Sequence, residues 1–319
     1  MIVTAEKTLE AIEKQMTFDH GALFKKYEQD FLPMMHDAYE VSVHPELRDH
    51  LGASVIGEPC TRKIWFNFRG FGSSAVTPRL NRLFNRGHLE EARFHAMLQA
   101  CGIQTFFQNE QEKQYGYKRG IFAGSVDGIA LDVPDCPNET VLLEFKTMND
   151  ARFKQFVAHD MMAFPTYENQ CHVNMFCMNL FNKELLQNFD LMKKLYDGEK
   201  KVNITKTLFM AVNKNTDEIH AVIIPLDEDK ARACIDKIPA VLEDCYPEGL
   251  HNHPKYFDCK MCGFNKYCYE NKEFPHNCRT CSLHKFNEDG TECCGFDFEK
   301  YSEDCYVPLA NNRIDFVKI

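Results

Sequence analysis

One short segment limits the fold of this chain more than any other. Residues 141–147, VLLEFKT, alternate between two faces of a predicted strand, so Val141, Leu143 and Phe145 point to one side. Glu144 and Lys146 point to the other side and project together from an otherwise apolar strand. The alternative interpretation is a salt bridge between these two residues on an edge strand.

The preceding predicted strand brings a second carboxylate to the same place. It contains Asp127, flanked by Gly124 and Gly128, which allow backbones to approach closely. A hairpin would set Asp127 roughly opposite Glu144. Carboxylates are ligands for Mg²⁺ or Mn²⁺, and Lys146 can orient or deprotonate water or stabilise developing charge. This constellation fits phosphodiester hydrolysis.

The composition is that of a globular chain. Its 319 residues are 44% hydrophobic and 26% charged, which suffices for one large core and a small accessory domain. No apolar run approaches a membrane span, and residues 1–16 lack the apolar region of a secretory signal, so we expect a cytoplasmic protein. In a reducing compartment, the 15 cysteines are better explained as metal ligands than as disulfides.

A basic stretch stands out in an acidic chain. The formal net charge is −10, yet no Asp or Glu occurs from Thr61 to Gly87. The stretch interleaves cations with aromatic residues. The cations are Arg62, Lys63, Arg69, Arg79, Arg82 and Arg86. The aromatic residues, which we expect in the core, are Trp65, Phe66, Phe68, Phe71 and Phe84. Arg79, Arg82 and Arg86 share one helical face. Such a stripe predicts phosphate binding, and the alternative is a solvated face.

Periodicity and turn residues predict alternating helices and strands. Helices are expected from a start within 51–72, over Pro78–Ala100, within 150–196 and over Lys230–Asp244. Strands are expected at Thr105–Phe107, Ile121–Asp132 and Val141–Thr147, and a hairpin at Lys206–Asn213 and Glu218–Leu226. After Pro247 the composition becomes rich in Cys, His and Asn, which places a domain boundary near Gly249.

At this point the chain resembles a known family. GSVDG followed by LLEFKT resembles the core of the PD-(D/E)XK nuclease superfamily, specifically its RecB-like exonuclease branch, which includes phage exonucleases and CRISPR-adaptation nucleases. The resemblance covers most of residues 50–270. It implies an α/β restriction-endonuclease-like core, a mixed sheet flanked by helices. In that core Asp127, Glu144 and Lys146 are catalytic, and the two carboxylates bind Mg²⁺ or Mn²⁺.

Two further segments carry the resemblance. RGHLEEARFHAML resembles the family's upstream helix, in which a residue four positions after a Gly reaches the metal. Here that residue is Glu91, and His88 and Glu90 are neighbours that could substitute. YENQCHVNMF resembles the helix after the catalytic strand, which implies a catalytic-site role for Gln170. Many relatives carry a Tyr four residues further on, where this chain has Asn174.

A first set of cysteines lies in CKMCGFNKYC. Its three thiolates come from Cys259, Cys262 and Cys268, and they leave one coordination position open on a metal or cluster. From the residues alone, His251 or His253 could complete a zinc site. The family resemblance extends to LGASVIGEPCTRKIWF. It implies that Cys60 is the fourth ligand of a 4Fe–4S cluster that closes a long loop.

A second set follows in the C-terminal tail. CRTC has the spacing of a zinc knuckle, and a zinc ribbon would use Cys278, Cys281, Cys294 and Cys305, with His284 or Cys293 as substitutes. Unmetallated thiols are the alternative. The remaining cysteines are most simply small apolar core residues: Cys101, Cys136, Cys171, Cys177, Cys234 and Cys245.

The resemblance therefore predicts a metal-dependent DNA exonuclease of phage replication, recombination or DNA processing, in the host cytoplasm if phage-encoded. DNA and a replication or recombination protein are the expected partners, with DNA contacts from Arg62, Arg79, Arg82 and Arg86. The alternatives are a catalytically silent DNA-binding or structure-specific endonuclease relative and an iron–sulfur regulatory protein. The expected organisation is a nuclease domain with an N-terminal helical region over 1–249, an iron–sulfur loop over 250–275 and a zinc-ribbon-like tail over 276–319.

Overall fold

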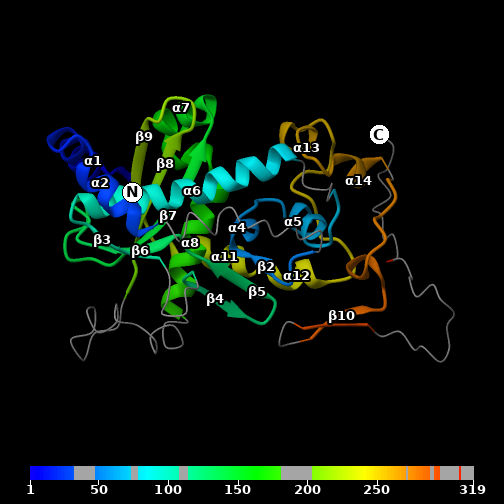
Figure 1. Cartoon of the computed structure of the whole chain (residues 1–319). Helices are drawn as coiled ribbons and strands as arrows, with labels where there is room; N and C mark the ends of the chain where they lie inside the picture. Colours follow the sequence, from blue (N-terminus) through cyan, green and yellow to red (C-terminus); the bar gives the residue numbers. More distant parts are fainter. Residues whose placement is uncertain are drawn as a thin grey trace. The chain divides into compact units, whose positions relative to one another are not determined.

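The computed structural model describes residues 1–31, 47–72, 78–107, 114–180, 203–270, 272–287, 291–294 and 309. The chain forms two compact units (Figure 1). The first consists of Met1–Val43, Val76–Tyr117 and Gly124–Arg232, and the second of His44–Ala75, Lys118–Ala123 and Ala233–Ile319. This division differs from the expected boundary near Gly249, because residues 44–75 group with the Cys-rich end of the chain.

The first unit is built on a six-stranded mixed sheet of order β1-β9-β8-β7-β6-β3. β7 and β8 run parallel, and every other neighbouring pair is antiparallel. The strands are β1 (Val3–Thr4), β3 (Gln104–Phe106), β6 (Gly128–Leu131), β7 (Val141–Met148), β8 (Lys206–Asn213) and β9 (Ile219–Pro225). The α/β architecture and the mixed sheet flanked by helices are as the sequence predicted.

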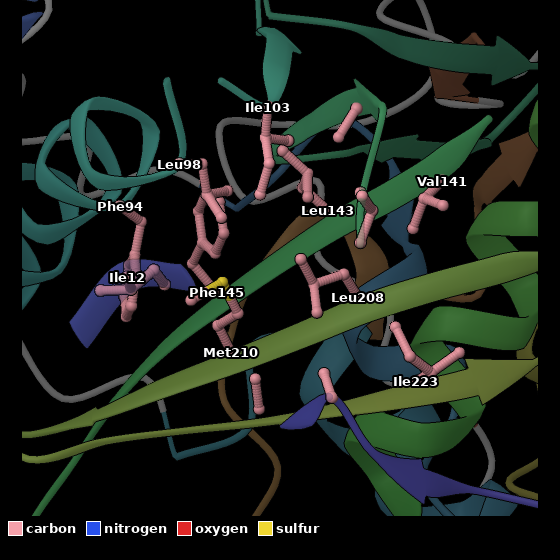
Figure 2. Packing of buried hydrophobic residues seen from close by; sticks show 14 of the residues in the cluster. Ile12, Phe94, Leu98, Ile103, Val141, Leu143, Phe145, Leu208, Met210 and Ile223 are labelled. Carbon is pink, nitrogen blue, oxygen red and sulfur yellow. The ribbon is translucent and has the colours of Figure 1, made fainter. Parts of the chain in front are cut away.

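Helices cover both faces of this sheet. The helices that pack on it are α1 (Glu6–Phe18), α6 (Pro78–Ala100), α7 (Asp150–His159), η1 (Asp160–Ala163) and α8 (Pro165–Leu180). In addition, α2 (Ala22–Asp30) packs on α6, and α11 (Glu228–Ile235) follows β9 in the chain. On one face, α1 and α6 pack on the sheet, and Figure 2 shows this cluster: Ile12, Phe94, Leu98, Ile103, Val141, Leu143, Phe145, Leu208, Met210 and Ile223. On the other face, α7, η1 and α8 pack on Phe209, Ala211, Val222 and Ile224.

The central strand β7 is buried on both sides, and this explains its apolar sequence. Val141, Leu143 and Phe145 belong to the cluster with α1 and α6. The alternation predicted from the sequence is therefore confirmed, and Glu144 and Lys146 project from the face opposite to that cluster.

The second unit is organised around an aromatic cluster. Trp65 and Phe66 are fully buried and pack with Phe71, Tyr246, Phe264, Tyr267, Phe274 and Leu309. Its elements are β2 (Leu51–Gly52), α4 (Ala53–Ile56), α5 (Thr61–Phe68), α12 (Ile238–Leu242), α13 (Phe257–Lys260), α14 (Asn265–Tyr269), η3 (Cys278–Thr280), β10 (His284–Phe286) and β11 (Glu292–Cys294). β2 pairs in parallel with β5 (Phe122–Ser125), which also pairs with β4 (Gly116–Arg119).

Several predicted elements differ from those observed. The helix expected over Lys230–Asp244 is broken between α11 and α12, where Pro239 occupies the first turn of the new helix. Phe84, expected in the core, is 55% exposed. The helical prediction for residues 181–196 lies outside the described residues. Within the described part of the chain, no helix is long and apolar enough to cross a membrane.

The first residue of β6, Gly128, provides a stability test. A Cβ at Gly128 would stand 2.8 Å from His95 Cε1 and 2.9 Å from the carbonyl oxygen of Phe106. We expect Gly128→Ala to lower the free energy of unfolding by about 1–3 kcal/mol, because backbone there must shift. The matched control is Gly87→Ala within α6, where a Cβ meets nothing within 4 Å. It should raise stability by about 0.5–1 kcal/mol. Equal denaturant midpoints for the two variants would contradict this packing.

Candidate functional site

The predicted catalytic residues meet in the first unit. Glu144 is 1% exposed, and its Oε1 pairs with Lys146 Nζ and accepts a hydrogen bond from Gln170 Nε2 at 2.9 Å. Asp127 lies just before β6, and its Oδ2 accepts the backbone N–H of Phe145 at 2.6 Å. The structure thus brings Asp127, just before β6, and Gln170, on α8, to the ion pair of Glu144 and Lys146 on β7.

This cluster holds more carboxyl groups than cationic groups. Burial raises the pKa of Glu144 to about 7, although Lys146 opposes that shift. Burial, followed by the nearby Asp127 carboxylate, raises the pKa of Glu91 to about 9. Burial also raises the pKa of Asp127. Among the described residues, three carboxyl groups therefore share a single ammonium group, that of Lys146.

One carboxylate oxygen in this cluster is unsatisfied. Glu144 Oε2 is buried and has no hydrogen-bond partner among the described residues. A buried acceptor without a partner is costly, and a bound cation would satisfy it. The donor set therefore fits Mg²⁺ or Mn²⁺, although no three Asp, Glu, His or Cys side chains of the described residues stand in metal-binding geometry. Glu144 is oriented instead towards Lys146 and Gln170.

Three residues are candidates for the third metal ligand, and their contacts distinguish them. Glu90 is buried, and Arg93 Nη1 binds both of its oxygens, at 2.9 and 3.0 Å. His88 is exposed on α6. Glu91 is half-buried, and it lies close enough to Asp127 for the charge of that carboxylate to raise its pKa further than burial alone does. Of these residues, Glu91 is the one that lies near Asp127, Glu144 and Lys146, whereas Glu90 is held by Arg93.

His95 belongs to this site although the sequence did not predict it there. This residue is fully buried, and its ring nitrogen Nε2 lies 2.9 Å from the backbone carbonyl oxygen of Asp127. Burial lowers the pKa of His95 to about 4, so the ring is neutral and donates Nε2–H to that carbonyl. Its position four residues after Glu91, on the same helical face, was the signal available in the sequence.

A tyrosine also reaches this region from β4. Tyr117 donates its hydroxyl hydrogen to Asn174 Oδ1 at 2.9 Å, and Asn174 Nδ2 lies 3.3 Å from the carbonyl oxygen of Ser125. Burial holds the pKa of Tyr117 well above its usual range, and the charge of Glu144 acts in the same direction. Asn174 therefore links the Tyr117 hydroxyl on β4 to the backbone of Ser125.

The basic stretch divides into two kinds of arginine. Arg79 and Arg82 on α6 are exposed, whereas Arg86 is half-buried and donates to the carbonyl oxygen of Lys214 at 2.8 Å. Arg69 is 1% exposed and donates to carbonyl oxygens at the end of α12. Arg62 is 3% exposed, which differs from the expected phosphate contact.

The first cysteine set lines one cavity in the second unit. This cavity of about 250 Å³ is lined by Cys60, Cys259, Cys262 and Cys268, together with Arg62, His251 and surrounding residues. Cys60 precedes α5, and the other three come from the loop and short helices α13 and α14. Burial raises the pKa of Cys268 to about 11, and burial also raises that of Cys262. No disulfide joins any of the described cysteines.

The alternative histidine ligands have other contacts. His251 lines the cavity, but its Nε2 lies 3.2 Å from Asp258 and its ring stacks on Tyr256. His253 Nδ1 accepts the backbone N–H of Lys255 at 3.1 Å. Four thiols and His251 therefore line one cavity, although no three of these side chains stand in metal-binding geometry among the described residues.

The second cysteine set is less compact. Cys281 is buried, whereas Cys278, Cys293 and Cys294 are exposed, and Cys305 lies outside the described residues. The β10–β11 hairpin sets His284 opposite Cys294, but the ring Nε2 of His284 pairs with Glu292 at 2.7 Å. Glu292 also pairs with buried Arg279. A zinc site in this tail stays a prediction.

Comparison with known proteins adds little to this geometry. No family model matches the chain, and no curated protein sequence matches it. A solved structure, the crystal structure of SSO0001, is similar over 79% of this chain and 96% of its own, with 15% identity and a TM-score of 0.35. A likeness at that level carries no argument about fold or function.

Proposed function

We propose that this chain is a PD-(D/E)XK-type nuclease that hydrolyses DNA phosphodiester bonds with Mg²⁺ or Mn²⁺. The observation that carries the proposal is the unsatisfied buried oxygen of Glu144, beside Asp127 and the Lys146 ammonium. A structural ion pair would leave no such acceptor and would not gather a surplus of carboxyl groups around one lysine.

The residues have separate roles in this proposal. Asp127, Glu144 and Glu91 would hold the metal, which when bound supplies a water of lowered pKa and charge neutralisation at the phosphate. Lys146 orients that water or stabilises the charge that develops on the phosphoryl oxygens. Gln170 fixes the orientation of Glu144 through its bond to Oε1, and His95 holds the backbone of Asp127.

An exonuclease is the first choice, and a catalytically silent DNA-binding relative is the second. A protein that only binds DNA has no need for buried Asp127, Glu144 and Lys146 together, because burying them costs free energy without contacting a phosphate.

We further propose a 4Fe–4S cluster on the thiols of Cys60, Cys259, Cys262 and Cys268, which share one cavity.

The catalytic proposal predicts the behaviour of two variants. Glu144→Gln keeps the shape of the side chain and loses its charge, and Lys146→Met removes the ammonium group. Both should lower cleavage of end-labelled DNA with Mg²⁺ or Mn²⁺ by about 100-fold or more. Glu139→Gln is the control, since Glu139 pairs with Lys206 near the surface of the same unit. Wild-type cleavage by Glu144→Gln would show that the site is misassigned, and an inactive wild-type protein that still binds DNA would favour the silent relative.

The basic stripe predicts a salt effect. The double variant Arg79→Gln/Arg82→Gln should bind DNA more weakly, and the slope of log affinity against log salt should fall by roughly one for each phosphate that the variant no longer binds. Lys7→Gln/Lys14→Gln removes two exposed cations from α1 and is the matched control. The same slope in both double variants would mean that the α6 arginines are merely solvated.

The cluster proposal predicts a loss of iron. Protein purified without air should be brown and carry about four iron atoms per chain. Cys60→Ser should lose that iron and unfold more easily, because the cluster joins distant parts of the chain. Cys245→Ser, at an exposed cysteine that does not line the cavity, should keep the iron. Zinc alone in the anaerobic protein, or full iron in Cys60→Ser, would overturn the proposal.

A further inference from the structure

The cysteine cavity contains a buried cation as well as four thiols. Arg62 lies in the first turn of α5, two residues after Cys60, and is 3% exposed. Its Nε donates to the carbonyl oxygen of Pro247 at 2.8 Å, and its guanidinium carbon lies 4.9 Å from the centre of the Tyr246 ring. These contacts hold the guanidinium group in one position at the cavity wall.

Arg62 differs from the other buried arginines of the unit in how its charge is balanced. Among the described residues, none of the ion pairs involves Arg62, whereas the equally buried Arg279 pairs with Glu292. Arg69 is surrounded by carbonyl oxygens at the end of α12. An unpaired buried charge costs several kcal/mol, so a partner for Arg62 is expected in the space that it faces.

That space is formed by cysteine sulfur atoms. Arg62 lines this cavity together with Cys60, Cys259, Cys262 and Cys268. Burial raises the pKa of the Cys268 thiol, and the nearby charge of Arg62 opposes that shift. A metal ion or iron–sulfur core bound by four thiolates carries net negative charge, since the four sulfur anions outweigh the core. The cavity therefore places a fixed positive group beside the position of an anionic metal–thiolate group.

We propose that Arg62 is the counter-charge of an anionic metal–thiolate group held by the four cysteines of this cavity. It is a positioning residue, which stabilises the thiolates through its positive charge. This inference rests on the metal site of the proposed function but not on DNA cleavage. It gives Arg62 a role in the second unit that excludes the phosphate contact expected from the sequence.

The test uses Co²⁺ as the probe. The full-length protein, freed of metal without air, is titrated with Co²⁺, and thiolate-to-cobalt absorption reports binding. Arg62→Gln should weaken Co²⁺ binding by about 10-fold or more, the usual cost of losing a partner of a metal ligand. Arg62→Lys keeps the charge and should recover most of the affinity. Lys266→Gln, which removes an exposed cation two residues before Cys268, should bind like the wild type.

A second readout uses protein reconstituted with iron and sulfide. The reduction potential of its cluster should be lower in Arg62→Gln than in the wild type, because a nearby positive charge favours the reduced cluster, which carries one more negative charge. Arg62→Lys, which retains the charge, should lie between them. A purely structural role for Arg62 would leave the potential of every folded variant unchanged.

The outcomes separate this inference from the proposed function. If the wild type gives no thiolate–cobalt absorption, the metal site itself is wrong. If the wild type and folded Arg62→Gln bind Co²⁺ equally and share one potential, the counter-charge is wrong and the metal site stands. If Arg62→Gln does not fold, Arg62→Lys decides: near-wild-type Co²⁺ affinity despite loss of the bond to Pro247 supports the counter-charge. An affinity that falls in parallel with stability overturns it.

Discussion

The buried pair of Glu144 and Lys146 is the constraint on which the first unit depends. Charges on a strand that is covered on both faces are unfavourable unless each finds partners. Glu144 finds Lys146 and Gln170, and both partners are held by elements that the sheet positions, β7 itself and α8. The two hydrophobic clusters on either side of the sheet supply the burial that makes these interactions rigid.

The surplus of carboxyl groups around that pair has a physical cost. A fold selected for stability alone would place leucine or methionine at such positions, because well-packed apolar residues can replace buried charges without lowering stability. Glu91 on a helix, Asp127 just before β6 and Glu144 on β7 are instead gathered around the lysine of β7. The helix-covered sheet is thus stable enough to carry a cluster that lowers its stability, which is the usual relation between a core and a functional site.

Much of the fold could be predicted because it is local. The alternation of VLLEFKT gives the two faces of β7, and the amphipathic period of 78–100 gives α6 with its observed ends. The break after Ile235 was missed although Pro239 was visible in the sequence, since the apolar period runs across it. His95 and the Tyr117–Asn174 pair were missed for a different reason. Their contacts join residues from separate elements, and although His95 stands four residues after Glu91, that spacing alone does not reveal its contact with the backbone of Asp127.

Cysteine and arginine show why some sites can be predicted and others cannot. A thiol set with short spacing has few chemical uses, so the grouping of Cys259, Cys262 and Cys268 could be expected from the sequence, whereas Cys60 was expected there only from the family resemblance. A guanidinium group can bind a phosphate, a carbonyl oxygen, an aromatic ring or a sulfur anion. The acid-free stretch therefore predicted one surface where the structure has two environments. Burial decides between them: Arg79 faces solvent, whereas Arg62 and Arg69 are enclosed by contacts from residues far along the chain.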